Sequence, residues 1–200
     1  MFFAFEGGDA TGKSTQMKLF VDWLRAQDLD VVTCRDPGGT PTGEAIRNLL
    51  LDPASEISPR CEALLYMAAR AELVDEVIRP ALKAGQVVVS DRFLLSNIVY
   101  QGHAGGIPTD ELWQLGHFAV GNVMPDVIFL LDMDPAVAAK RLTRSLDRLE
   151  QRGLEYQQRL REGFLAEAAR APEKIVVIDA SQSIEAVHQA ICTAAARALA

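Results

Sequence analysis

Five short runs of apolar residues alternate along this chain with segments whose apolar residues recur at helical spacing. Runs this short and this continuously apolar are typical of strands buried on both faces of a parallel sheet, whose neighbours need helical crossover connections. The sequence therefore predicts an α/β fold in which a five-stranded parallel sheet is surrounded by helices. The expected strands are Phe2 to Phe5, Val31 to Cys34, Gln86 to Ser90, Val127 to Leu131 and Ile175 to Ile178.

The chain is expected to form one domain, because no repeat, low-complexity stretch or linker divides its residues 1–200. Parallel sheets bind ligands beyond the carboxyl ends of their strands. In this sequence the expected strands are followed by polar residues, and we expect functional side chains there. The segments in question begin at Glu6, Arg35, Asp91 and Asp132.

A glycine-rich segment lies between the first expected strand and the first expected helix. It reads Gly7-Gly8-Asp9-Ala10-Thr11-Gly12-Lys13-Ser14 and matches the GxxxxGK[ST] pattern of phosphate-binding loops. In such loops backbone N–H groups face phosphate oxygens, the lysine reaches the β and γ phosphates, and the serine hydroxyl binds Mg²⁺. The alternative is an ordinary glycine-rich turn. Pattern and position together favour a nucleoside triphosphate, such as ATP, with Mg²⁺.

The charge distribution narrows the classes of partner. The chain carries a net charge of −7, which argues against nucleic-acid binding along a broad basic surface. Residues 140–161 hold seven cations and three acids, a net charge of +4, so the rest of the chain carries −11. A polyanionic ligand is therefore expected to be small and to bind at a focused site.

Other patterns bear on location and on the class of nucleotide protein. No apolar stretch is long enough to span a membrane, the first residues lack the basic segment of a signal peptide, and three widely spaced cysteines indicate reduced thiols. We expect a cytoplasmic protein with no membrane partner. A GTPase would need a guanine-reading Asn-Lys-x-Asp motif, which the sequence lacks. A motor or transporter ATPase usually needs partner domains, for which 200 residues leave little room. Of these classes of nucleotide-binding protein, a small kinase is the one that remains.

A second polar cluster follows the third expected strand. Asp91 can hold a water bound to magnesium, and Arg92 can make a bidentate contact with a phosphate. Asn97 and Tyr100 lie three residues apart on one helical face beyond Arg92, where they can contact a base and a sugar. Taken alone, Asp-Arg at a strand end is as often a salt-bridged helix entry.

Four motifs, in order and spacing, resemble the bacterial thymidylate kinases, which are P-loop nucleoside monophosphate kinases. The resemblance runs from Phe5 to about Val187, and it implies a P-loop three-layer αβα sandwich and the phosphorylation of dTMP to dTDP by ATP and Mg²⁺. The motifs are Phe5 to Thr15, Arg35-Asp36-Pro37-Gly38-Gly39-Thr40, Asp91-Arg92-Phe93 with Tyr100-Gln101-Gly102, and Asp147-Arg148-Leu149-Glu150.

The resemblance implies roles for residues on the dTMP side. Asp9 matches a carboxylate near the acceptor's 3′-hydroxyl, Tyr66 a ring that stacks on thymine, and Arg70 the arginine that reads O4. Asn97 matches a residue that contacts the edge of the base, Tyr100 matches a ring that favours deoxyribose, and Pro37 matches a proline that follows a cis bond. The resemblance also places Arg35, Arg92 and Gln101 at the acceptor site. The family usually has Glu at Asp36 and Tyr at Phe93, so any hydrogen bonds of those two groups are in doubt.

The resemblance also implies a nucleotide-binding loop from Gly7 to Thr15, with Ser14 and Asp91 as the magnesium residues. The catalytic residues would be Asp9, Lys13, Arg92 and an arginine on a lid at about 141–154. Because Ala10 and Thr11 in the loop carry no charge, the sequence resembles the lid type, with Arg148 as the first candidate and Arg144 as the second. Arg141 and Gln182 resemble residues around adenine. In the same basic segment, intrahelical pairs such as Glu155 with Arg159 are expected to account for Arg152 and Arg161.

The expected reaction is ATP + dTMP → ADP + dTDP by direct in-line transfer. One alternative is another nucleoside monophosphate or deoxynucleoside kinase, because the phosphate loop and the lid would serve any of them. A second is a noncatalytic nucleotide-binding module. Members of the resembled family are commonly homodimers, so a homodimer is also expected.

Overall fold

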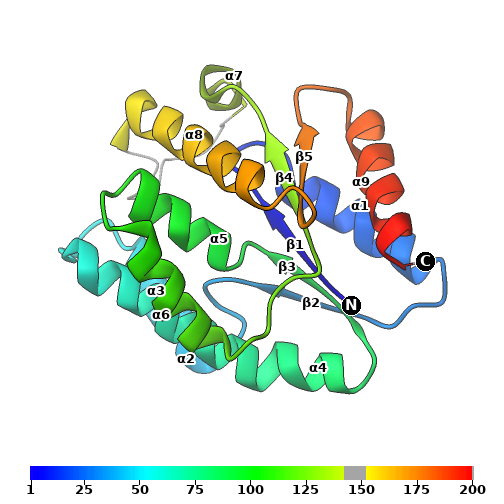
Figure 1. Ribbon diagram of the computed structural model, residues 1–200, viewed down its shortest axis with the longest axis horizontal. Coiled ribbons are helices and arrows are strands. Elements are labelled where there is room, and N and C mark those ends of the chain that lie inside the picture. The colour runs from blue at the N-terminus through cyan, green and yellow to red at the C-terminus, as the bar shows by residue number, and fades with distance from the viewer. Residues whose placement is uncertain (142–151, 200) are drawn as a thin grey trace.

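A computed structural model describes residues 1–141 and 152–199. At its centre lies a sheet of five parallel strands in the order β2-β3-β1-β4-β5 (Figure 1). This arrangement confirms the predicted parallel sheet. The strands are β1 (Phe2–Glu6), β2 (Val31–Arg35), β3 (Val87–Asp91), β4 (Val127–Asp132) and β5 (Ile175–Asp179).

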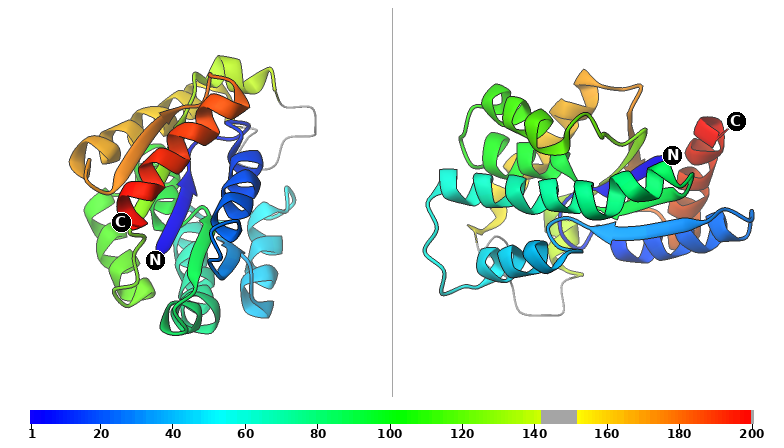
Figure 2. Two further views of the ribbon diagram at one scale, coloured as in Figure 1. Left: turned by 90° about the vertical axis from the view of Figure 1, so that its right-hand side faces the viewer. Right: turned by 90° about the horizontal axis from the view of Figure 1, so that it is seen from below.

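Helices cover both faces of the sheet, so the molecule has three layers (Figures 1 and 2). Helices α1 (Lys13–Arg25) and α9 (Ile184–Leu199) pack together on one face. The helices α2 (Pro41–Leu51), α3 (Pro59–Leu73), α4 (Arg79–Lys83), α5 (Leu94–Asn97), α6 (Thr109–Val120) and α8 (Leu154–Arg170) lie on the other side, with π-helical segments η1 (Val74–Ile78) and η2 (Ile98–His103). A short helix, α7 (Pro135–Ala139), follows β4.

The alternation of side chains along each strand explains the two cores. In β1, Phe2 and Ala4 face the layer that contains α3 and α8, whereas Phe3 and Phe5 face the layer of α1 and α9. All four side chains are buried, as the continuous apolar run predicts for a strand covered on both faces.

Each strand extends to the polar residue that follows its apolar run. Arg35 and Asp91 pair with each other in the ladder, as do Asp132 and Asp179 at the opposite side of the sheet. The carboxyl ends therefore meet along one edge and carry charged side chains, as expected for a ligand-binding edge. No helix in the described part of the chain is long and apolar enough to cross a membrane.

Candidate active site

The glycine-rich segment forms a tight loop between β1 and α1. Gly7 has a φ of 131°, and a Cβ atom there would lie 2.4 Å from the carbonyl oxygen of Leu131, so the close approach to β4 requires glycine. Gly12 has a φ of 94° and ends the loop as the N-cap of α1. The Nζ atom of Lys13 folds back over the loop and donates to the carbonyl oxygens of Gly7 at 3.2 Å and Gly8 at 2.6 Å.

Burial makes the charged form of Lys13 costly. Desolvation, helped by the positive charge of Arg92, lowers the pKa of Lys13 to about 8. A buried ammonium that rests on two carbonyl oxygens would gain from the arrival of a polyanion. The loop is therefore arranged to receive phosphate groups.

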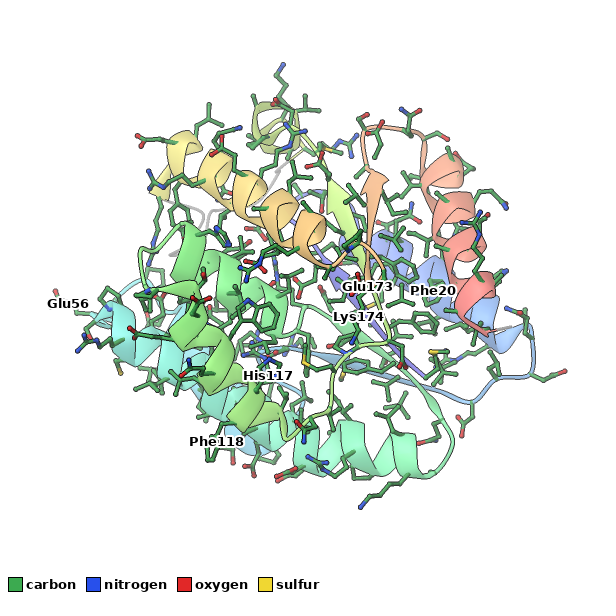
Figure 3. The ribbon with its side chains drawn as sticks, viewed as in Figure 1. Phe20, Glu56, His117, Phe118, Glu173 and Lys174 are labelled. Carbon is green, nitrogen blue, oxygen red and sulfur yellow. The ribbon has the colours of Figure 1, made fainter. Side chains whose placement is uncertain are left out.

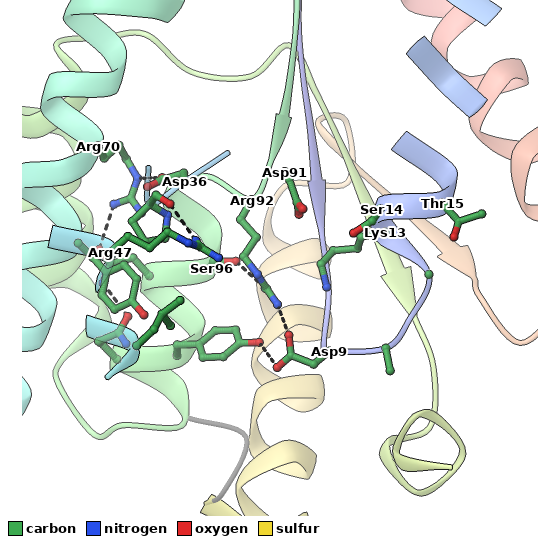
Figure 4. A pocket seen from close by; sticks show the side chains of 18 of the residues that line it. Asp9, Lys13, Ser14, Thr15, Asp36, Arg47, Arg70, Asp91, Arg92 and Ser96 are labelled. Carbon is green, nitrogen blue, oxygen red and sulfur yellow. Dashed lines mark hydrogen bonds and ion pairs between the residues drawn. The ribbon is translucent and has the colours of Figure 1, made fainter. Parts of the chain in front are cut away.

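Arg92 lies opposite this loop, at the end of β3, and its backbone adopts a left-handed φ of 66°. Its guanidinium donates to the Asp9 carboxylate at 2.6 Å, to the Gly7 carbonyl at 3.0 Å and to the Ser96 hydroxyl at 3.0 Å (Figure 4). The Tyr100 ring lies under the guanidinium, 5.1 Å from its carbon, and the Tyr100 hydroxyl donates to Asp9 at 3.2 Å. These contacts hold one cation and one carboxylate beside the phosphate loop.

Burial raises the pKa of Asp9, but the neighbouring charges of Arg92 and Lys13 outweigh it and lower that pKa below its ordinary value. Asp9 is therefore held as a carboxylate.

Glu6, the last residue of β1, is buried behind this pair. Its carboxyl group accepts from the backbone N–H groups of Phe93 at 2.9 Å and Ser96 at 3.1 Å and from the Ser96 hydroxyl. Burial raises the pKa of Glu6 to about 7. Glu6 thus fixes the turn that carries Arg92. The sequence does not reveal this role; it shows only that Glu6 begins the polar segment after the first expected strand.

A cavity of about 480 Å³ joins these groups. The phosphate loop lies at one end of the cavity, and Arg70 of α3 lies at the far end, with Arg92 between them (Figure 4). The sequence-predicted residues that line it are Asp9, Ala10, Gly12, Lys13, Ser14, Thr15, Pro37, Tyr66, Arg70, Asp91, Arg92, Asn97, Tyr100, Gln101 and Arg141. Segments that are far apart in the sequence are therefore brought to one site.

The far end of the cavity combines a ring with a fixed guanidinium. Tyr66 and Arg70 lie one turn apart on α3, and both line the cavity. The Arg70 Nε atom donates to Asp36, and its NH1 atom donates to the Asn97 side-chain oxygen at 3.0 Å (Figure 4). The peptide bond before Pro37 is cis, as predicted. Asp36, where the resemblance left the hydrogen bond in doubt, is thus a buried partner of Arg70.

Two side chains fit a magnesium ion bound with phosphates. Ser14 and Asp91 both line the cavity near Lys13 (Figure 4). The Asp91 Oδ1 atom is buried and has no hydrogen-bond partner among the described residues. Mg²⁺ in phosphate sites typically takes one or two protein oxygens and keeps waters and phosphate oxygens as its other ligands. No cluster of three or more His, Cys, Asp or Glu suited to a metal occurs in the described parts of the chain, 1–141 and 152–199.

Some predicted residues lie elsewhere. Arg35 is not among the residues that line the cavity; it pairs with Glu44 at 2.7 Å, and its side chain is 53% exposed. The Gln182 side chain donates to Asp179 at 2.8 Å on the surface. Gly7, Gly8 and Thr11 line a second cavity on the other side of the phosphate loop, between β4 and α8. Arg144 and Arg148, the two lid candidates, lie outside the described residues, as does most of the lid segment.

The expectation that Arg152 and Arg161 form only intrahelical pairs is wrong. Arg161 reaches Asp132 at the end of β4 with two hydrogen bonds of 2.8 and 2.9 Å, and Arg152 pairs with Glu62 on α3 at 3.3 Å. Both contacts join segments that are distant in the sequence, which helical spacing alone does not reveal. The Glu155 to Arg159 pair is confirmed at 2.7 Å.

Arg47 is a further cavity residue that sequence reasoning missed. It extends from α2, lines the cavity beside Asp36, and donates to the Pro37 carbonyl at 2.9 Å. Its signal in the sequence is an arginine on the helix that follows the Asp-Pro-Gly-Gly turn.

Comparisons with known proteins identify the family. The family model of thymidylate kinase matches residues 5–191. A thymidylate kinase of Symbiobacterium thermophilum is 47% identical over 96% of this chain and 90% of its own length, and one of Bifidobacterium longum strain DJO10A is 48% identical over 96% and 95%. The crystal structure of a thymidylate kinase from Ehrlichia chaffeensis superposes with a TM-score of 0.82 at 32% identity, covering 98% of each chain. This chain therefore belongs to the thymidylate kinase family.

Proposed function

We propose that this protein transfers the γ-phosphoryl group of ATP to dTMP and releases ADP and dTDP. The observation that carries the proposal is that a phosphate loop, the half-buried Arg92 and Asp9 pair, and the recess formed by Tyr66, Arg70 and Asn97 all line one cavity of about 480 Å³. Lys13 would contact the donor phosphates, and Tyr66 with Arg70 would hold the acceptor base. The two substrates would meet at Arg92 and Asp9.

The residues at the far end suit a pyrimidine. The Tyr66 ring offers a stacking surface, Arg70 offers a donor for O4, and the Asn97 oxygen beside it offers an acceptor. Tyr100 lies between this recess and Asp9, where its ring would crowd a ribose 2′-hydroxyl. Arg92 would hold the acceptor phosphate, and Arg47 faces the same space.

The chemistry needs alignment and charge more than a base. The acceptor phosphate has a second pKa of about 6, so at neutral pH it is largely a dianion and needs no proton removed. The obstacle is repulsion between two polyanions, which cations placed on the transferring group reduce. Lys13 and Arg92 would supply two such cations, and both of them donate to the Gly7 carbonyl oxygen.

Ser14 and Asp91 would hold Mg²⁺, Ser14 through its hydroxyl and Asp91 through a bound water. The ion would neutralise charge on the β and γ phosphates. Arg141 would pack against adenine, since it lines the cavity and reaches the Ala180 carbonyl at 3.4 Å in the loop before α9. For the lid arginine we propose Arg148, with Arg144 as the alternative, on the resemblance alone.

A coupled ADP-release assay across a panel of monophosphates tests the substrate. We expect kcat/KM for dTMP to exceed that for dCMP and GMP by about a hundredfold or more, because each mispaired buried polar group costs roughly tenfold. UMP presents the same base edge as dTMP, so we expect its lower kcat/KM to come from the 2′-hydroxyl that Tyr100 would crowd and from the missing methyl group. Faster turnover of another monophosphate would identify a different nucleoside monophosphate kinase. ATP binding without turnover of any monophosphate would instead indicate a noncatalytic module.

We also propose that the protein forms a homodimer through α3 and α6. Phe118 on α6 is 89% exposed (Figure 3), and Leu115 on the same helix and Leu64 on α3 are 41% and 53% exposed. Helices α3 and α6 pack against each other, and we propose that the exposed apolar side chains of both helices form one apolar contact face of the dimer. A large exposed ring in an apolar patch is typical of a protein interface.

Phe118→Asp is expected to convert the dimer into a monomer, because it places a charge in the centre of the apolar face. Multi-angle light scattering after gel filtration measures the mass. The matched control is Ile184→Asp, which introduces the same charge at an exposed apolar residue of α9. A wild-type protein of monomer mass, or a Phe118→Asp variant of dimer mass, contradicts the proposed interface.

A further inference from the structure

A chain of buried hydrogen bonds runs from the base recess to the start of α3. Arg70 Nη1 donates to Asn97 Oδ1 at 3.0 Å, Asn97 Nδ2 donates to Gln101 Oε1 at 2.8 Å, and Gln101 Nε2 donates to Glu62 Oε1 at 2.9 Å. All four residues are at most 2% exposed. At the far end, Arg152 Nη2 lies 3.3 Å from the other Glu62 oxygen.

The two ends of this chain fix the direction of every bond in it. A guanidinium can only donate and a carboxylate can only accept, whereas an amide can do either, depending on which way it is turned. If Gln101 turned over, its oxygen would face the oxygen of Glu62. If Asn97 turned over, its NH₂ group would face the guanidinium of Arg70. Thus one orientation of the two amides satisfies all four groups, and in it the Asn97 oxygen faces Arg70 and the cavity.

We propose that Glu62 determines which base the site accepts, acting through Gln101 to hold the Asn97 amide with its oxygen toward the cavity. The inference rests on the proposed function. Asn97 Oδ1 accepts from Arg70 and has a second lone pair for a ligand. The recess therefore presents a donor beside an acceptor.

This pattern complements thymine. Thymine offers O4, an acceptor, next to N3–H, a donor, so Arg70 can donate to O4 while Asn97 accepts from N3–H. Cytosine offers the reverse, an amino group next to an unprotonated N3. Each reversed contact leaves a buried polar group without a partner. Glu62 and Gln101 are positioning residues in this scheme, since each acts on the base through Asn97.

Arg152 supports the carboxylate from the other side. Its guanidinium donates to Glu62 and lies 4.9 Å from the ring centre of Tyr156, whose hydroxyl donates to the Tyr100 carbonyl at 3.0 Å. A buried carboxylate is costly without a paired cation. The Arg152 contact therefore offsets part of the cost of burying the Glu62 carboxylate.

Glu62→Gln tests the proposal, because it gives the acceptor-only end of the chain a donor. The new amide either turns its NH₂ group toward Arg152, where two donors meet, or turns it toward Gln101 and favours the reversed chain, which conflicts with Arg70. We expect KM for dTMP to rise, kcat to change little, and the ratio of kcat/KM for dTMP over dCMP to fall about tenfold. The matched control, Glu72→Gln on the same helix, should keep the wild-type ratio.

A second substitution, Asn97→Asp added to Glu62→Gln, provides a specific rescue. The introduced carboxylate accepts from Arg70 and from the Gln101 NH₂ group, and the Gln101 oxygen accepts from the introduced amide, whose own oxygen accepts from Arg152. Every group is satisfied again, the total charge is unchanged, and an acceptor still faces the cavity. We expect the double variant to recover most of the lost discrimination, whereas damage to packing would not be repaired by a second change.

The proposal is overturned by a Glu62→Gln variant that folds and keeps the wild-type ratio, or by a double variant that recovers nothing. If Glu62→Gln does not fold, the double variant decides, because it should fold and discriminate, and its failure in either respect also overturns the proposal. Failure of the proposed function is distinct, because then the wild-type enzyme itself shows no preference for dTMP.

Discussion

Arg92→Met is expected to lower kcat/KM for dTMP by about a thousandfold, a loss like that of a catalytic oxyanion donor. Methionine keeps much of the apolar stem but removes the guanidinium that contacts Asp9, Gly7 and Ser96. The acceptor phosphate would lose its main cation, and the half-buried Asp9 carboxylate would lose its closest cationic partner. Steady-state kinetics with dTMP as the varied substrate measure the effect, which should fall on both KM and kcat.

The control for this result is Arg159→Met. Arg159 is also paired with an acid, Glu155, but its side chain is 45% exposed on the outer face of α8. An exposed ion pair of this kind contributes little to the stability of the fold, and Arg159 does not line the cavity. The kcat/KM of Arg159→Met should therefore stay within about threefold of the wild-type value. A loss below about tenfold in Arg92→Met would show that the acceptor phosphate binds elsewhere.

Lys13→Met is expected to lower kcat by about a thousandfold, because it removes from a buried site the ammonium group that we propose neutralises the β and γ phosphates. The ammonium is held by the Gly7 and Gly8 carbonyl oxygens until phosphate arrives. Single-turnover measurements with saturating ATP report the chemical step directly. A rate within about tenfold of wild type would rule out the assigned role of Lys13.

The pH dependence of ATP binding gives a second signature of Lys13. Burial lowers the pKa of Lys13 to about 8, and bound phosphate favours the charged form. The affinity of the ligand-free protein for ATP should therefore fall as the pH rises through about 8, and this dependence should be absent in Lys13→Met. Lys18→Met, at an exposed position on the same helix, should retain it.

The fold could be predicted from the sequence because its signal is local. Phe2, Phe3 and Phe5 stand in a run without polar residues, and such a run is stable only where both faces of a strand are covered. The exact end of each strand was less predictable, since Arg35 and Asp91 continue the ladder although they are polar. Their backbones pair while their side chains reach the edge of the sheet.

The site was predictable where a motif fixes the backbone, as at Lys13 and Arg92. The position of a side chain was less predictable where its hydrogen-bond or ion-pair partner comes from a segment distant in the sequence. Arg35 belongs to a motif of the family, yet Glu44 on α2 holds it at the surface, and Arg47 from the same helix faces the cavity instead. Nothing in the spacing of arginines decides which of the two points inward.

The buried partners of Arg70 show the same limit more sharply. The sequence places Arg70 one turn after Tyr66, which suggests a shared face. It carries no sign that Asp36 and Asn97 meet that arginine, or that Gln101 and Glu62 continue the chain. These contacts depend on how β2, α3 and α5 pack together, and they carry the proposed choice of base.

Transfer of a labelled phosphoryl group tests the central claim most directly. With ATP labelled at the γ-phosphate, dTMP and Mg²⁺, the label is expected at the β-phosphate of dTDP, in an amount equal to the ADP formed, with dTMP required for ADP release. Label recovered as inorganic phosphate, or ADP released at the same rate without dTMP, would contradict the claim that this site aligns a nucleotide donor with a thymidylate acceptor.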